Sequence, residues 1–88
     1  MVLNGKTQTR FSVQADYEVN TLSRVLELFT IRGLTCENLT ARKTNDGQQW
    51  IELHCCNVGD HGAYVILQKL RQIVPVRTVQ IETLVLTA

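Results

Sequence analysis

The residues best suited to chemistry are three cysteines and one histidine, namely Cys36 and the run His54, Cys55 and Cys56. There is no Cys-x-x-Cys motif, and an odd number of cysteines without disulfide spacing fits a reducing compartment. Alternation along a strand puts Cys55 on the opposite face from His54 and Cys56, so the three cannot bind one ion, and two ligands do not make a metal site. We therefore expect no metal, and cysteines that behave as small, fully or partly buried apolar residues.

The rest of the sequence excludes several classes of protein. It holds no carboxylate pair, no nucleophile beside a base and no phosphate-binding loop, so we expect neither catalysis nor a cofactor. With 44% hydrophobic and 19% charged residues and a formal charge of +1, the composition is typical of an ordinary globular protein and not of a nucleic-acid-binding arm. Its apolar runs are far too short to cross a membrane. The start MVLNGKTQT lacks the features of a secretory signal, which favours the cytoplasm.

The length predicts one small domain spanning residues 1–88, with a core at about 8–83. The sequence has no low-complexity run, repeat or linker. At this size burial alone gives modest stability, so association with a copy or partner is favoured.

The first half of the chain predicts a strand, a helix and a second strand. Phe11, Val13 and Ala15 alternate with polar residues over 8–15, as in a strand with one covered face. The helix begins after Asn20, a good N-cap, and ends at Gly33. Its apolar stripe has helical spacing and consists of Leu22, Val25, Leu26 and Phe29. In the strand 34–43 the apolar residues change phase, which predicts a bulge near Glu37–Asn38.

The second half predicts a hairpin, a helix and a last strand. Asn45-Asp46-Gly47 is typical of a tight hairpin turn. The strand 48–57 points Ile51, Leu53 and Cys55 inward and Trp50, Glu52, His54 and Cys56 outward. A helix capped by Asp60 runs to Val74 and is ended by Pro75. A strand follows over 76–83. The tail 84–86 breaks the alternation, so we expect both of its faces to be covered, for instance by a second chain.

These elements follow the order βαββαβ. Right-handed crossovers then place both helices on one face of a four-stranded antiparallel sheet, which is the ferredoxin-like α+β fold. The other face of the sheet stays bare, and the edge strand 34–43 favours a homodimer in which two sheets join side by side.

Three functions of this topology fit the residues poorly. An RNA-binding module needs aromatic residues on its central strands, and only Trp50 is available there. A metallochaperone needs cysteines after the first strand, where this chain has Asp16 and Tyr17. An acylphosphatase-like enzyme needs an arginine and a glycine-rich turn at the same place, and both are missing.

A fourth function, a regulatory module, is supported by a resemblance. The stretch TLSRVLELFTIRGLTCENLTAR resembles the ACT domain of the small, regulatory subunit of acetolactate synthase, whose usual pattern is close to NEPGALSRVxxLFxxRGYNIESLTV. LSRVxxLFxxRG is its most specific part. The resemblance continues in LQKLRQIVPVRTVQ and covers roughly residues 9–82.

The resemblance implies a non-catalytic protein that binds and activates the large, thiamine-diphosphate-dependent subunit of acetolactate synthase in branched-chain amino-acid biosynthesis. In many members valine inhibits the complex through this domain. Two domains join into one eight-stranded sheet, and the amino-acid effector lies at their interface. An isolated amino-acid-sensing dimer with another partner is the alternative.

By the same resemblance, an effector would contact Asp16, Tyr17, Asn20, Thr21 and Thr35. Several of these positions depart from the family pattern. Tyr17 and Thr35 replace asparagines, Val19 a proline and Asn20 a glycine. A side chain at position 20 occupies space that glycine leaves open. The resemblance is therefore to short, valine-insensitive members that serve mainly as activators.

Two questions about single residues stay open at this stage. Asn20 is explained as a helix cap or as a ligand contact, and the hydroxyls of Thr21 and Thr35 either line a polar pocket or are simply exposed. Trp50 and His54 share the bare face of the sheet, where they form a partner contact or are merely solvated.

Overall fold

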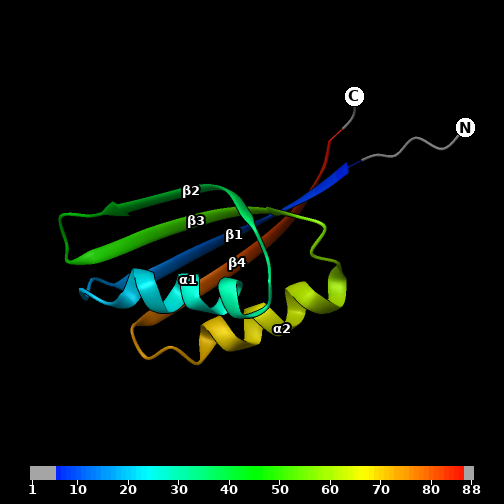
Figure 1. Cartoon of the computed structure of the whole chain (residues 1–88). Coiled ribbons are helices and arrows are strands. Elements are labelled where there is room, and N and C mark those ends of the chain that lie inside the picture. Colours follow the sequence, from blue (N-terminus) through cyan, green and yellow to red (C-terminus); the bar gives the residue numbers. More distant parts are fainter. Residues whose placement is uncertain (1–5, 87–88) are drawn as a thin grey trace, which may run out of the picture.

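The computed structural model describes residues 6–86. The elements are β1 (Lys6–Asp16), α1 (Thr21–Ile31), β2 (Cys36–Lys43), β3 (Gln48–Cys56), α2 (Asp60–Arg71) and β4 (Val76–Leu86). The strands form one antiparallel sheet in the order β2-β3-β1-β4, and both helices lie on one of its faces (Figure 1). The predicted ferredoxin-like fold is confirmed. Residues 1–5 and 87–88 of the predicted domain, which include most of the segment used to infer location, lie outside the described part.

The core lies between the helices and the two central strands. Residues of odd number on β1 and β3 point into it, as the alternation predicted, and meet the apolar stripes of α1 and α2. Phe11 and Phe29 touch edge to face, with ring centroids 5.0 Å apart. Each large side chain buried here contributes roughly 1.5–3 kcal/mol. The core residues are Phe11, Val13, Val25, Phe29, Ile51, Leu53, Cys55, Ile66, Leu70 and Val79.

The predicted bulge in β2 is confirmed. The register between β2 and β3 shifts between Cys36 and Asn38, so Glu37 is the extra residue. The two turns predicted from glycines are also present. Gly33 after α1 and Gly47 in the β2–β3 hairpin have positive φ, at 70° and 79°, which glycine adopts without steric cost.

The predicted side-chain cap of α1 is wrong. Asn20 does occupy the N-cap position, but its side chain makes no cap hydrogen bond. Its φ of −99° and ψ of 8° lie outside the extended region from which a cap side chain reaches back to the helix amides. Instead, the hydroxyl of Ser23 donates to the carbonyl oxygen of Asn20 at 3.1 Å.

Both predicted ends of α2 also need correction. Gly59 holds the N-cap position, so Asp60 is the first helical residue and not the cap. The helix ends at Arg71, short of Val74, because the amides of Gln72 and Ile73 bond three residues back and Pro75 disfavours the helical conformation of the residue before it.

The last strand is longer than predicted. It continues through the tail to Leu86 and pairs with β1 along its length. Val85 is 67% exposed, so the chain itself does not cover both faces of the tail. Covering of this tail by a second chain remains a prediction.

One core position carries an unpartnered hydroxyl. Thr21, the first residue of α1, is fully buried, and its Oγ1 has no hydrogen-bond partner. The alternative that the hydroxyl of Thr21 is exposed is therefore wrong. The buried hydroxyl is removed from water without a hydrogen bond that would compensate for the loss.

We expect Thr21→Val to raise the free energy of unfolding by about 1 kcal/mol, because it removes a buried polar atom that has no partner. Urea denaturation measures the change. Thr30→Val is the matched control, since the hydroxyl of Thr30 is exposed and donates to the carbonyl of Leu26. If Thr21→Val loses more stability than the control, the hydroxyl of Thr21 must make a stabilising contact in the folded protein, and the prediction is wrong.

None of the three cysteines forms a disulfide bond within residues 6–86, but two of them touch. Cys36 and Cys55 are register partners on β2 and β3, and their Sγ atoms are 3.5 Å apart. Cys55 is buried and Cys56 donates to the carboxylate of Glu37 at 2.8 Å. Burial, and then the hydrogen bond with Cys36, raises the pKa of the Cys55 thiol to about 12.

We expect Cys55 to resist alkylation in the folded protein, because the thiolate is the reactive form and is scarce at this pKa. Iodoacetamide at about pH 8, followed by peptide mass spectrometry, should modify Cys56 well before Cys55, and the two should react alike in urea. Equal rates in the folded protein would show that Cys55 is not shielded.

Candidate functional site

The loop between β1 and α1, residues 17–20, is the site that the sequence indicated first. The amide of Tyr17 donates to the carbonyl of Gly47 at 2.8 Å, and that of Asp16 donates to the carbonyl of Pro75 at 2.8 Å. These two bonds fix the start of the loop between the β2–β3 hairpin and the beginning of β4.

Two basic side chains contact the residues at the start of the loop. Arg77 holds the carboxylate of Asp16 through two hydrogen bonds of 3.0 and 2.8 Å, and the same contact raises the pKa of the guanidinium. The ammonium of Lys43 lies 4.5 Å from the centroid of the Tyr17 ring. The carboxylate of Asp16 is therefore already paired, while the first amides of α1 can still receive an anion.

The five predicted effector residues do not all meet within one chain. Four of them, Asp16, Tyr17, Asn20 and Thr21, lie in or beside this loop, with Asn20 exposed and Thr21 buried. Thr35 follows the far end of α1, and the 11 residues of that helix span roughly 16 Å. An effector that touched Thr35 would need that residue from a second copy.

The open face of the sheet holds a second candidate site, a hollow of about 300 Å³. Three rows of side chains cross this face in the observed register, from β2 through β3 and β1 to β4. They are Asn38, His54, Arg10 and Glu82; Thr40, Glu52, Ser12 and Gln80; and Arg42, Trp50, Gln14 and Thr78. The middle row contains the short Ser12 and Thr40 between two rows of longer side chains, which creates the hollow.

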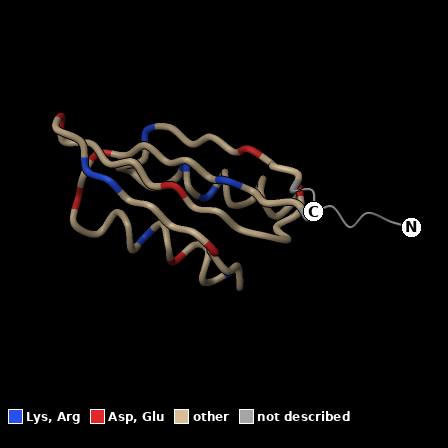
Figure 2. The backbone as a smooth tube through the Cα atoms, turned by 90° about the horizontal axis from the view of Figure 1, so that it is seen from above, with Lys and Arg blue, Asp and Glu red and all other residues tan. Residues whose placement is uncertain are grey.

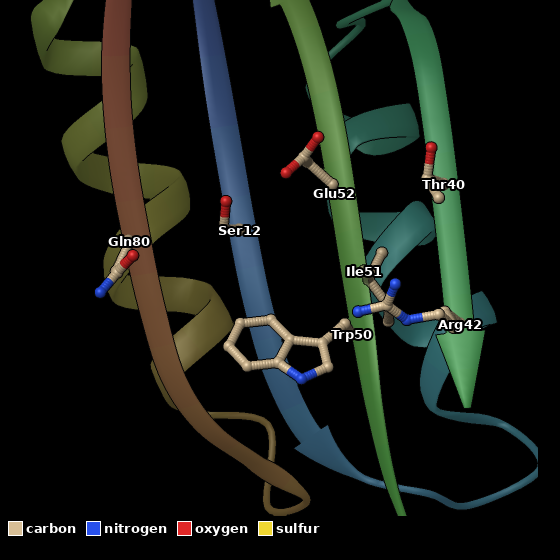
Figure 3. A pocket seen from close by; sticks show the side chains of 7 residues that line it. All are labelled: Ser12, Thr40, Arg42, Trp50, Ile51, Glu52 and Gln80. Carbon is tan, nitrogen blue, oxygen red and sulfur yellow. The ribbon is translucent and has the colours of Figure 1, made fainter. Parts of the chain in front are cut away.

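Figure 3 shows how the side chains surround the hollow. The indole of Trp50 lies across β1, the carboxylate of Glu52 projects between β3 and β1, and the guanidinium of Arg42 reaches from β2 toward β3. Trp50 is 40% exposed. The lining residues are Ser12, Thr40, Arg42, Trp50, Ile51, Glu52 and Gln80.

The two residues predicted on the bare face are therefore placed at this hollow. Trp50 lines the hollow directly. His54 contacts Glu52, which is another lining residue and whose Oε1 lies 3.1 Å from His54 Nε2. Arg42, Ser12 and Thr40 were missed. Their parity alone puts them on this face, but only the strand register brings them beside Trp50.

Charged residues of both signs are spread over the strands and helices, without a large region of one sign (Figure 2). Between residues 6 and 86 no group of three histidine, cysteine or acidic side chains could hold a metal ion. Neither helix of this part is long and apolar enough to span a membrane.

Comparison with solved structures establishes the fold. The ACT domain of GTP pyrophosphokinase from Chlorobium tepidum is similar with a TM-score of 0.76 at 12% identity, over 88% of this chain and 99% of that one. The regulatory subunit of aspartate kinase from Thermus thermophilus gives a TM-score of 0.65 at 10% identity, over 92% of this chain and 53% of that one. A putative glycine cleavage system transcriptional repressor gives 0.72 at 10%, over 97% and 51%.

The family follows from the sequence. None of the curated proteins matches significantly, but the profile of the family described as ACT-like domain matches residues 2–88. ACT domains are regulatory, amino-acid-sensing domains without catalysis of their own, and they commonly form dimers. The match spans nearly the whole chain, and the chain therefore belongs to the ACT-like domain family.

Proposed function

We propose that this protein is a regulatory small subunit of acetolactate synthase, which binds and activates the large catalytic subunit in the cytoplasm without the usual valine pocket. The observation that carries the proposal is the motif LSRVxxLFxxRG, which falls on α1 and its terminal turn. Its apolar residues Val25 and Phe29 are buried and Gly33 has positive φ.

The exposed residues of the same motif are the ones that the fold does not require. Arg24 and Arg32 are both exposed at α1, and the structure gives neither an ion pair within residues 6–86. Charged groups at such positions suit contact with a partner or with water.

The state of the loop supports valine insensitivity. An amino-acid effector brings both a carboxylate and an ammonium group, yet Asp16 is already paired with Arg77. Asn20 adds a side chain where the family pattern has glycine, and Tyr17 is covered on one side by Lys43. If an effector is retained here, we propose that it contacts Asp16, Tyr17, Asn20 and Thr21 of one copy and Thr35 of the other.

Free strand edges support the side-by-side homodimer. Among the strands of residues 6–86, β2 pairs only with β3, and its residues after Cys36 are all exposed. Leu39, an apolar side chain on this edge strand, is 41% exposed. Pairing with a second β2 would satisfy the free backbone groups and cover this side chain.

An isolated amino-acid-sensing dimer is the second candidate. The hollow on the open face of the sheet favours it, since a site formed within one chain needs no catalytic subunit to complete it.

We expect the purified protein to raise the activity of the acetolactate synthase large subunit from the same organism at least severalfold, and we expect valine to leave this activity unchanged. Reconstitution with and without this chain, over a valine titration, measures both. Failure to activate would exclude the proposed partner. Inhibition by valine would show instead that the loop retains a working effector site.

We expect Leu39→Glu to shift the protein from dimer to monomer, because it places a charge in the proposed contact while leaving the core intact. Light scattering at micromolar concentration gives the mass. Val74→Glu is the matched control, since Val74 is 90% exposed and adjoins β4 at the opposite edge. A wild-type monomer, or an unchanged Leu39→Glu dimer, would rule out this interface.

A further inference from the structure

The hollow on the open face contains an arginine with no partner. Arg10 is paired with Glu82 and Arg77 with Asp16. The guanidinium of Arg42 makes no hydrogen bond, ion pair or ring contact within residues 6–86. A planar group with several donors, placed at the rim of a hollow, is suited to a carboxylate, which it can bind through two parallel hydrogen bonds.

Glu52 supplies the opposite charge and is held in place. Its Oε1 lies 3.1 Å from His54 Nε2, and the carboxylate points into the space between β3 and β1 (Figure 3). Arg42 faces Trp50 on the neighbouring strand and Thr40 faces Glu52. Arg42 and Glu52 are thus diagonal neighbours, with Cα atoms about 7–8 Å apart, and they form no salt bridge with each other. Both residues line the hollow, so a molecule that fills it would meet both charges.

Trp50 and the hydroxyl groups define the rest of the ligand. The exposed indole offers a flat apolar surface for a planar group, and Ser12 and Thr40 line the hollow with groups that donate or accept hydrogen bonds. The volume, about 300 Å³, is at the lower end of the range for ligand pockets, roughly 300–1,000 Å³. It therefore suits a small metabolite and not a large cofactor.

We infer that this hollow is a binding site for a free α-amino acid with a planar side chain. Its carboxylate binds Arg42, its ammonium group binds the oxygen of Glu52 that His54 leaves free, and its side chain lies on the indole of Trp50. The cation and anion of such a ligand stand a few ångströms apart, which matches one arginine and one carboxylate placed diagonally.

The balance of charge argues against other ligands. A nucleotide or inorganic phosphate would meet one arginine and would be repelled by Glu52. A single-stranded nucleic acid needs a continuous basic groove and more than one aromatic platform, whereas this face carries both signs of charge and one aromatic residue. A zwitterion is the class that pairs with both charges at once.

The inference deepens the proposed regulatory function and rests on it for its biological meaning, because it names the effector class and moves the site from the loop to the sheet. Binding is measured on the isolated chain, whereas activation requires the catalytic subunit. Binding can thus fail while activation succeeds, and the reverse.

The intrinsic fluorescence of Trp50 is the first test, because it is the only tryptophan in the chain. We expect saturable changes with L-phenylalanine and L-histidine. Phenylalaninamide, which lacks the carboxylate, and 3-phenylpropionate, which lacks the ammonium group, should each bind roughly tenfold or more weakly. Failure of both amino acids to bind, or tighter binding of AMP or of either analogue, would overturn the inference.

Variants test the two charged contacts separately. Arg42→Gln and Glu52→Gln should each weaken phenylalanine binding about tenfold or more, measured by isothermal titration, while circular dichroism confirms that they fold. Arg71→Gln and Glu27→Gln, the same changes at exposed positions of α2 and α1, should leave the affinity unchanged. Binding that survives both sheet variants would place the ligand elsewhere, such as the loop, and refute the site.

Discussion

Burial on one face only is the constraint on which this small fold depends. The inward side chains of β3, namely Ile51, Leu53 and Cys55, are fully buried, and the outward ones between them are polar or half exposed. A register slip of one residue would exchange these two sets. The helices must then both lie on the same side, since only that side is apolar. The open face is thus a consequence of the same pattern that builds the core.

Patterns within a single element could be predicted from the sequence. The strand alternation, the helical stripe and the bulge at Glu37 each depend on residues that are near neighbours in the chain. The glycine turns are equally local, because Gly33 and Gly47 adopt a backbone conformation that other residues rarely accept. The helix starts were less predictable. Asn20 and Asp60 are good cap residues by type, but the backbone angle at Asn20 and the competing Gly59 decided the outcome.

Features that join distant elements could not be predicted in this way. The contact of Cys36 with Cys55 and the ion pair of Asp16 with Arg77 depend on strand register, which the bulge in β2 and a second irregularity at Gln14–Ala15 both shift. The hollow is of the same kind. Ser12 and Thr40 are unremarkable in the sequence, and only their place in one row beside Glu52 makes a cavity of them.

The hollow and the proposed dimer edge share one strand. Thr40 and Arg42 line the hollow from β2, whose other side pairs with no strand in the described part of the chain. A ligand held between Arg42 and Glu52 would connect β2 to β3 through side chains as well as through the backbone ladder, and so would reduce the conformational freedom that β2 loses when it pairs with a copy. Linkage is reciprocal, so dimer formation would strengthen ligand binding by the same factor. In this arrangement a small effector on the open face would act on the proposed dimer without entering the loop where Asn20 and Tyr17 depart from the family pattern.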